Sequence, residues 1–209
     1  MDETPWFRAG RLAWAASETA RDEQIANARQ LEGMSISRVR YFTLDYGQLD
    51  HAGLPDGPRI IVSEGEWENP SWRFDKFESV DFYIEIETAN QRAFTIGWDP
   101  PSSTEGLWMR EGATEGEPFA SGAPVAVWDV THHGQWSNLV GGVVTSVEPR
   151  YKRWDHPAGF VCDLVTLAAR DQALLVFLGG VGENLEMAPA VDNLLTISAG
   201  TRAPEWLDL

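Results

Sequence analysis

Four histidines and many carboxylates are the side chains of this sequence that could do acid–base or metal chemistry. His132 and His133 are adjacent, and His156 follows Asp155 in a Trp-Asp-His-Pro turn. Adjacent side chains of a strand point to opposite faces, whereas a two-histidine metal clamp on a strand needs one residue between its ligands. We therefore predict no metal site and no cofactor. One alternative stays open, a small-molecule enzyme that uses His132 or His133 with Asp155 and His156.

Other catalytic patterns are absent or incomplete. The sequence contains no Gly-x-Ser-x-Gly nucleophile elbow. Its single cysteine, Cys162, has apolar neighbours, which is typical of a buried, inert thiol. The glycine run at 179–182 lacks the third glycine and the following helix of a dinucleotide-binding loop. No specific reaction can be derived, and the balance favours a protein that is not an enzyme.

Carboxylates and tryptophans combine into one candidate binding surface. The chain has 10 tryptophans and 32 acidic residues. Aromatic side chains anchor protein interfaces, and a field of negative charge steers a basic partner. Exposed tryptophans also suit sugar rings, so carbohydrate binding is a second alternative. The predicted binding residues are Glu64, Glu66, Trp67, Glu68, Trp72, Glu85 and Glu87, with Phe74 and Phe77 beside them.

The charge balance excludes two classes of partner. The net charge is −16 and the isoelectric point is near 4.5. Nucleic acids and anionic membranes need a basic face, so we expect neither as a partner. A basic protein fits the charge. One concrete version is an immunity-type inhibitor that neutralises a cationic toxin such as a nuclease.

Composition also suggests where the protein is found. Only Lys76 and Lys152 are lysines among 16 basic residues, a composition that we associate with a GC-rich bacterial genome. A single cysteine gives no sign of secretion, and residues 1–5 have neither the cationic start nor the apolar run of a signal peptide. The apolar stretch 173–182 is too short to span a bilayer. We expect a cytoplasmic protein.

The hydrophobic pattern predicts one early helix followed by strands. An Ala-rich segment without internal Gly or Pro predicts a helix over about 12–32 that ends at Gly33. Alternation over 81–98 predicts a half-buried hairpin whose acidic face, with Glu85 and Glu87, is solvated. The nearly continuous apolar segments 160–167 and 174–178 predict central strands that are buried on both faces.

The sequence also contains an apparent internal repeat. The spacing Leu-x-Gly-x-x-Ile-x-x-Val at 31–39 recurs at 139–147. The hairpin at 80–96 aligns without gaps on 161–177, which matches Phe94 with Leu175 and Ile96 with Phe177. Chance alternation explains part of this match, but the order of elements is also the same. We predict a duplication over about 31–111 and 139–200.

These patterns together predict a mainly β (α+β) fold in a single compact domain over residues 1–209. Two similar antiparallel β-meander units would pack as a sandwich or barrel, with the N-terminal helix covering one side. The acidic edge at 81–87 would resist pairing with a second copy, which favours a monomer. The order of segments 45–72 and 100–122 is left open.

Overall fold

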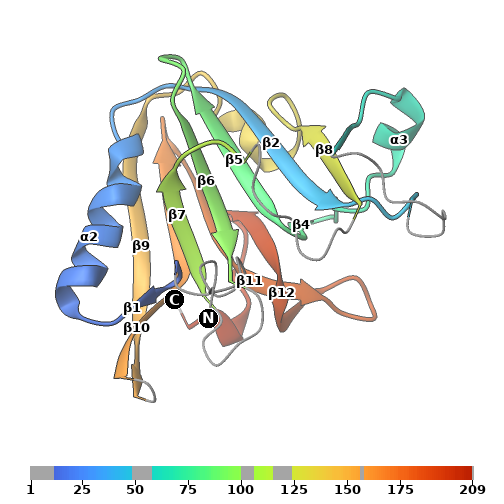
Figure 1. Ribbon diagram of the computed structural model, residues 1–209. Helices are drawn as coiled ribbons and strands as arrows, with labels where there is room; N and C mark the ends of the chain where they lie inside the picture. The colour runs from blue at the N-terminus through green and yellow to red at the C-terminus, as the bar shows by residue number, and fades with distance from the viewer. Residues whose placement is uncertain (1–11, 49–57, 100–105, 115–123, 156–157, 209) are drawn as a thin grey trace, which may run out of the picture.

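The computed structural model describes residues 12–48, 58–99, 106–114, 124–155 and 158–208 (Figure 1). These residues are mainly β, with two packed sheets, one longer helix and no closed barrel. The predicted fold class is confirmed, and of the two predicted arrangements the structure has the sandwich.

The first sheet is mixed. Its strands lie in the order β3-β8-β2-β5-β6-β7, and all neighbours are antiparallel except β3 and β8, which are parallel. The bounds are β2 (Ile36–Leu44), β3 (Arg59–Ile60), β5 (Tyr83–Thr88), β6 (Ala93–Trp98), β7 (Leu107–Glu111) and β8 (Val125–Asp129).

The second sheet is antiparallel throughout. β10 has β9 along one edge, and its other edge is shared by β1 and β11, after which β12 and β4 follow. The bounds are β1 (Trp14–Ala15), β4 (Glu78–Val80), β9 (Val144–Asp155), β10 (Ala158–Ala169), β11 (Gln172–Val181) and β12 (Met187–Ser198).

The helix is shorter at its start than predicted. α2 spans Glu18–Ala28 and continues as the 3-10 turn η1 (Arg29–Leu31). It begins at 18 because residues 14–15 pair with β10, and because the Ser17 hydroxyl caps it by accepting from the Ala20 N–H. Gly33 follows the end at φ +80°, as predicted for a helix stop. α2 packs against β7 and β9, and so covers the side of the sandwich where these strands lie (Figure 1).

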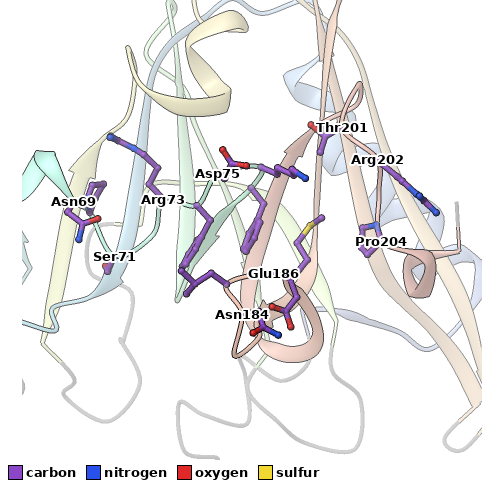
Figure 2. Close-up of a pocket in the computed structure, with 15 residues that line it drawn as sticks. Asn69, Ser71, Arg73, Asp75, Asn184, Glu186, Thr201, Arg202 and Pro204 are labelled. Carbon is purple, nitrogen blue, oxygen red and sulfur yellow. The ribbon is translucent and has the colours of Figure 1, made fainter.

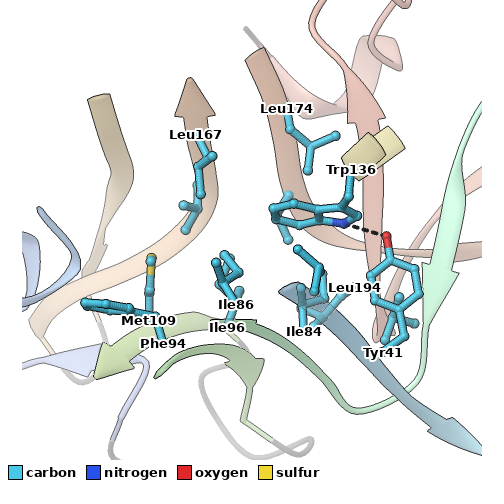
Figure 3. Close-up of a cluster of buried hydrophobic side chains, with 14 of the residues drawn as sticks. Tyr41, Ile84, Ile86, Phe94, Ile96, Met109, Trp136, Leu167, Leu174 and Leu194 are labelled. Carbon is cyan, nitrogen blue, oxygen red and sulfur yellow. Dashed lines mark hydrogen bonds between the residues drawn. The ribbon is translucent and has the colours of Figure 1, made fainter. Parts of the chain in front are cut away.

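The main core lies between the sheets. The side chains that meet there from the central strands are Ile84, Ile86, Phe94 and Ile96 of the first sheet and Val165, Leu167, Leu174 and Val176 of the second (Figure 3). A second cluster lies on the outer face of the second sheet, where Leu164, Leu175 and Phe177 pack under Phe77 and Leu207. Strands β10 and β11 are therefore buried on both faces, as their continuous apolar sequence predicts.

A buried polar cluster joins the two sheets. Tyr41 of β2 donates to Glu78 Oε2 of β4 at 2.5 Å, and Trp136 Nε1 donates to the Tyr41 hydroxyl at 2.6 Å (Figure 3). Thr196 Oγ1 donates to the same Glu78 oxygen at 3.1 Å, and the Gln135 N–H donates to Oε1 at 3.0 Å. Burial raises the pKa of Glu78, while these hydrogen bonds oppose the shift.

The two meander units have the same strand order. The first runs β2-β5-β6-β7 and the second β9-β10-β11-β12. They meet where β2 and β9 begin, and the hydrogen bonds there are reciprocal. The Gly33 N–H donates to the Val144 carbonyl, and the Gly141 N–H donates to the Ile36 carbonyl. These pairs join positions that the sequence repeat makes equivalent, and the duplication itself stays a prediction.

The hairpins of the two units differ by one residue, so the gapless alignment needs a correction. Ile86 pairs with Phe94, whereas Leu167 pairs with Leu174. Leu174, and not Leu175, is therefore the equivalent of Phe94 in the core between the sheets. Leu175 lies in the outer cluster, because a shift of one residue moves a strand's side chains to the other face.

The buried polar cluster leads to a stability prediction. Tyr41→Phe removes one hydroxyl that both donates to Glu78 and accepts from Trp136, so two buried polar groups lose a partner. We expect the free energy of unfolding to fall by about 1–3 kcal/mol in urea titrations. Tyr46→Phe is the matched control, because Tyr46 is 53% exposed and should change stability by less than about 0.5 kcal/mol. Equal losses in both variants would contradict a structural role for the cluster.

Candidate functional site

Three tryptophans and a histidine form an aromatic cluster under the short helix α3 (Glu64–Glu68). Trp67 of α3 meets Trp72 and Trp128 edge to face, with ring centroids 6.0 and 5.1 Å apart. Trp72 and Trp128 meet in the same way at 5.9 Å. Trp67 also stacks on the His133 ring, with the two ring centroids 4.3 Å apart. Such contacts stabilise beyond simple burial, so α3 has a rigid base.

This cluster corrects the expectation of an exposed tryptophan platform. Trp72 is 1% exposed and Trp128 is 6% exposed, and Trp67 is half-buried. Trp72 therefore supports the surface from below and is not part of it. Among the tryptophans in the described residues, only Trp154 is exposed, and it lies in β9, outside this cluster.

The predicted acids of segment 64–68 do lie on the surface, at a projecting end of the molecule. We call residues 59–68, which comprise β3, its following turn and α3, the acidic tip. Figure 1 shows α3 at the opposite end of the molecule from α2. Glu64 and Glu68 are exposed and make no ion pair with any described residue. The tip thus presents uncompensated negative charge.

Arg59 fixes β3 and α3 in place. Its guanidinium pairs with Asp45 Oδ2 at 2.6 Å, in the turn after β2, and with Glu66 Oε1 of α3 at 2.8 Å. These carboxylates raise the pKa of Arg59 above its ordinary value, so its charge is permanent. One cation therefore holds the tip together and is itself neutralised by two carboxylates.

The tip also exposes apolar side chains that the sequence analysis did not single out. Val62 is 83% exposed and Ile60 is 64% exposed, whereas Ile61 between them is 4% exposed and packs into the core. An Ile-Ile-Val run in the sequence suggests a buried strand. Only the alternation about a strand at the end of the sheet turns two of the three side chains to solvent.

The prediction that Glu85 and Glu87 form a solvated acidic face is wrong. Glu85 is 1% exposed, ion-paired with Arg40, and accepts the Thr114 N–H. Glu87 lies 3.2 Å from the same guanidinium. The reason is the pairing of β2 with β5, which sets Arg40 opposite Glu85 and Arg38 opposite Glu87. The matching alternation of arginines in 38–40 and acids in 85–87 is a signal that could have predicted these pairs.

The histidine and aspartate candidates are not brought together. His132 and His133 are exposed in the connection from β8 to the 3-10 turn η3 (Gly134–Asn138), whereas Asp155 ends β9 at a hairpin tip. Figure 1 shows that hairpin tip far from the end of β8. His156 lies outside the described residues. Within the described part of the chain, no group of three or more His, Cys, Asp or Glu side chains could hold a metal ion.

Outside the cluster around Glu78, the pKa values of Cys162 and Asp99 are also raised. Burial raises the pKa of Cys162 to about 12, and its 1% exposure confirms the prediction that this thiol is buried. Burial also raises the pKa of Asp99 to about 7. Asp99 Oδ2 accepts the Ala13 N–H at 2.8 Å, so this carboxylate ties the start of β1 to the end of β6. Both groups are buried, and the cavity that Cys162 helps to line has a volume of only about 20 Å³.

A groove of about 1180 Å³ lies on the outer side of the second sheet (Figure 2). Segments 69–77 and 201–204 form its walls, and the β11–β12 turn closes one end. The rings of Phe74 and Phe77 stack in this groove with their centroids 4.8 Å apart. The charged lining is mixed in sign, and Arg73 and Arg202 extend to opposite sides in Figure 2. The space between the two β units, where the enzyme alternative places its pocket, is filled by core side chains.

No protein-family model matches the chain, and searches of curated proteins and of solved structures found no match either. No helix in the described segments has the length and apolar character that a membrane crossing requires. The functional argument therefore depends on the geometry described above, and the acidic tip is its strongest feature.

The raised pKa of Asp99 predicts a pH dependence of stability. The folded state holds the Asp99 proton up to about pH 7, whereas the ordinary value is 3.8. Between these values the folded state binds more protons than the unfolded state, so the free energy of unfolding falls as pH rises. Asp99→Asn should flatten this slope by up to a few kcal/mol, at about 1.4 kcal/mol per pKa unit. Urea titrations at pH 4.5 and 7.5 measure it.

Asp75→Asn is the matched control for this slope, because it makes the same chemical change at an exposed carboxylate. An Asp99→Asn protein whose stability still falls with pH as steeply as the parent's would show that Asp99 is not the titrating group.

Proposed function

We propose that this chain is a non-catalytic binding module for a basic protein, and that the acidic tip is its contact surface. One observation carries the proposal, the exposure of Ile60 and Val62 beside Glu64 and Glu68, which lack ion pairs with described residues. Apolar side chains that become buried supply most of the energy of an interface, and surrounding charges set its specificity and rate of association.

The rigidity of the tip supports this proposal. The aromatic cluster holds α3 from below, and the two ion pairs of Arg59 hold β3 and α3 to the turn after β2. A surface that is already ordered loses little conformational entropy on binding. The tip is thus suited to recognition, although it has no catalytic group.

The net charge of −16 supports a basic partner. An immunity-type inhibitor of a cationic nuclease is one concrete form, in which the acids of the tip occupy the place of substrate phosphates. The enzyme alternative is weakened because His132 and His133 lie apart from Asp155. The carbohydrate alternative is weakened because Trp72 and Trp128 are buried. A cytoplasmic location, a bacterial source and a monomeric state stay predictions.

Charge reversal at the tip tests the proposal. Glu64→Lys with Glu68→Lys should weaken binding to a cationic ribonuclease about tenfold or more, equivalent to about 1.4 kcal/mol, in isothermal titration at low salt. Glu23→Lys with Glu148→Lys, which reverses exposed carboxylates on α2 and β9, should change the dissociation constant less than about threefold. Both double variants change the net charge equally, so the comparison separates a local surface from overall charge.

Two results would overturn the proposal. Equal weakening by both double variants would mean that only net charge matters and that the tip is no contact surface. The second result is that no member of a panel of cationic nucleases binds the parent protein, at low or at moderate salt. This would contradict the proposal that the partner is a basic protein.

A further inference from the structure

The strand β3 has an open edge. It is the end strand of the first sheet among the described residues, with β8 on its one paired side. The Ile61 N–H donates to the Val127 carbonyl of β8 at 2.9 Å. Alternate residues of a strand turn their main-chain groups to opposite edges, so Ile60 directs its N–H and C=O away from β8. An edge of this kind is a template for one more strand.

Proteins blunt edge strands by keeping them very short, or with lysine, proline, a bulge or a covering segment. β3 is only two residues long, but it contains neither lysine nor proline, and among the described residues no strand pairs with its other side. Residues 60–62 are Ile-Ile-Val, and the 64% and 83% exposures of Ile60 and Val62 show that no described segment covers their side chains. An added strand would find two β-branched side chains to pack against, as well as main-chain groups of Ile60 that bond to no other described strand.

The charges beside this edge select the kind of strand. Arg59 is occupied by Asp45 and Glu66 at 2.6 and 2.8 Å, so it offers no free cation to an acidic partner. Glu64 and Glu68 follow the edge without ion pairs in the described residues. A second copy of this chain would bring like charges together at the same place. A strand that alternates apolar residues with Lys or Arg fits both the side chains and the charges.

We propose that the open edge of β3 binds an extended, basic strand of the partner protein by strand addition. Main-chain hydrogen bonds would form at Ile60 and Val62, and Lys or Arg side chains of the partner would pair with Glu64 and Glu68. This inference rests on the proposed function and gives its binding mode.

The test uses blocked heptapeptides that alternate valine and lysine, and measures their binding to the full chain by fluorescence anisotropy. One peptide is N-methylated at every valine and another at every lysine. Because the N–H groups of a strand alternate between its edges, only one series blocks the edge that faces β3. We expect one methylated peptide to bind as the unmodified peptide does and the other to bind at least tenfold more weakly. A peptide that alternates valine and glutamate should not bind.

A matched pair of variants locates the binding site. Val62→Lys places a like charge on the edge and should weaken the valine–lysine peptide at least tenfold. Val143→Lys makes the same change at another exposed valine, 49% exposed at the start of β9, and should leave the affinity unchanged within about twofold. Unfolding curves of both variants check that each protein remains folded.

The outcomes separate this inference from the proposed function. If both methylated peptides bind equally, or if no peptide binds at 1 mM while a cationic ribonuclease still binds through Glu64 and Glu68, strand addition is wrong and the binding surface stands. Equal effects of Val62→Lys and Val143→Lys would also overturn strand addition at β3. If neither peptides nor cationic nucleases bind, both proposals fail.

Discussion

The buried carboxylate of Glu78 is the constraint on which the arrangement of the two sheets depends. An unpartnered carboxylate in an apolar core would be very costly, and three donors from different elements remove that cost. Tyr41 belongs to the opposite sheet, so its hydrogen bond fixes how the sheets face each other. The η3 backbone also approaches closely, because a Cβ at Gly134 would overlap the Glu78 carboxylate. These contacts favour one packing of the two sheets against each other. The position of the acidic tip depends on that packing.

Much of the fold could be predicted because its signals are local. The continuous apolar runs of β10 and β11 indicate burial on both faces. In the structure, Phe77 and Leu207 cover the face of these strands that points away from the first sheet. Pairings between distant segments leave no such signal. Nothing in the sequence around Trp14 indicates that it leaves the helix to pair with β10. The one-residue difference between the hairpins was missed because alternation is the same in either register.

The candidate site could be predicted only in part, for a related physical reason. Glu64 and Glu68 are exposed as expected, because a short surface helix has few ways to bury them, whereas Glu66 pairs with Arg59. Local alternation could not predict the burial of Glu85, because its partner Arg40 lies on a strand far away in the sequence. The burial of Trp72 could not be predicted either, because the burial of an aromatic residue in an irregular segment depends on what packs over it. Exposure of Ile60 and Val62 follows from β3 being the end strand, which only topology decides.

The placement of β4 and β1 has a consequence for how the chain reaches this fold during synthesis. β4 precedes β5 in the chain but lies in the second sheet beside β12, and β1 pairs with β10. β3 likewise pairs only with β8, so the N-terminal half leaves the ribosome with three strands whose partners have not been made. Contacts so distant in sequence form late, since the intervening loop must close first. The core face of the first sheet therefore stays uncovered until the second sheet forms, and a nascent chain stalled midway would expose this face to other cellular proteins.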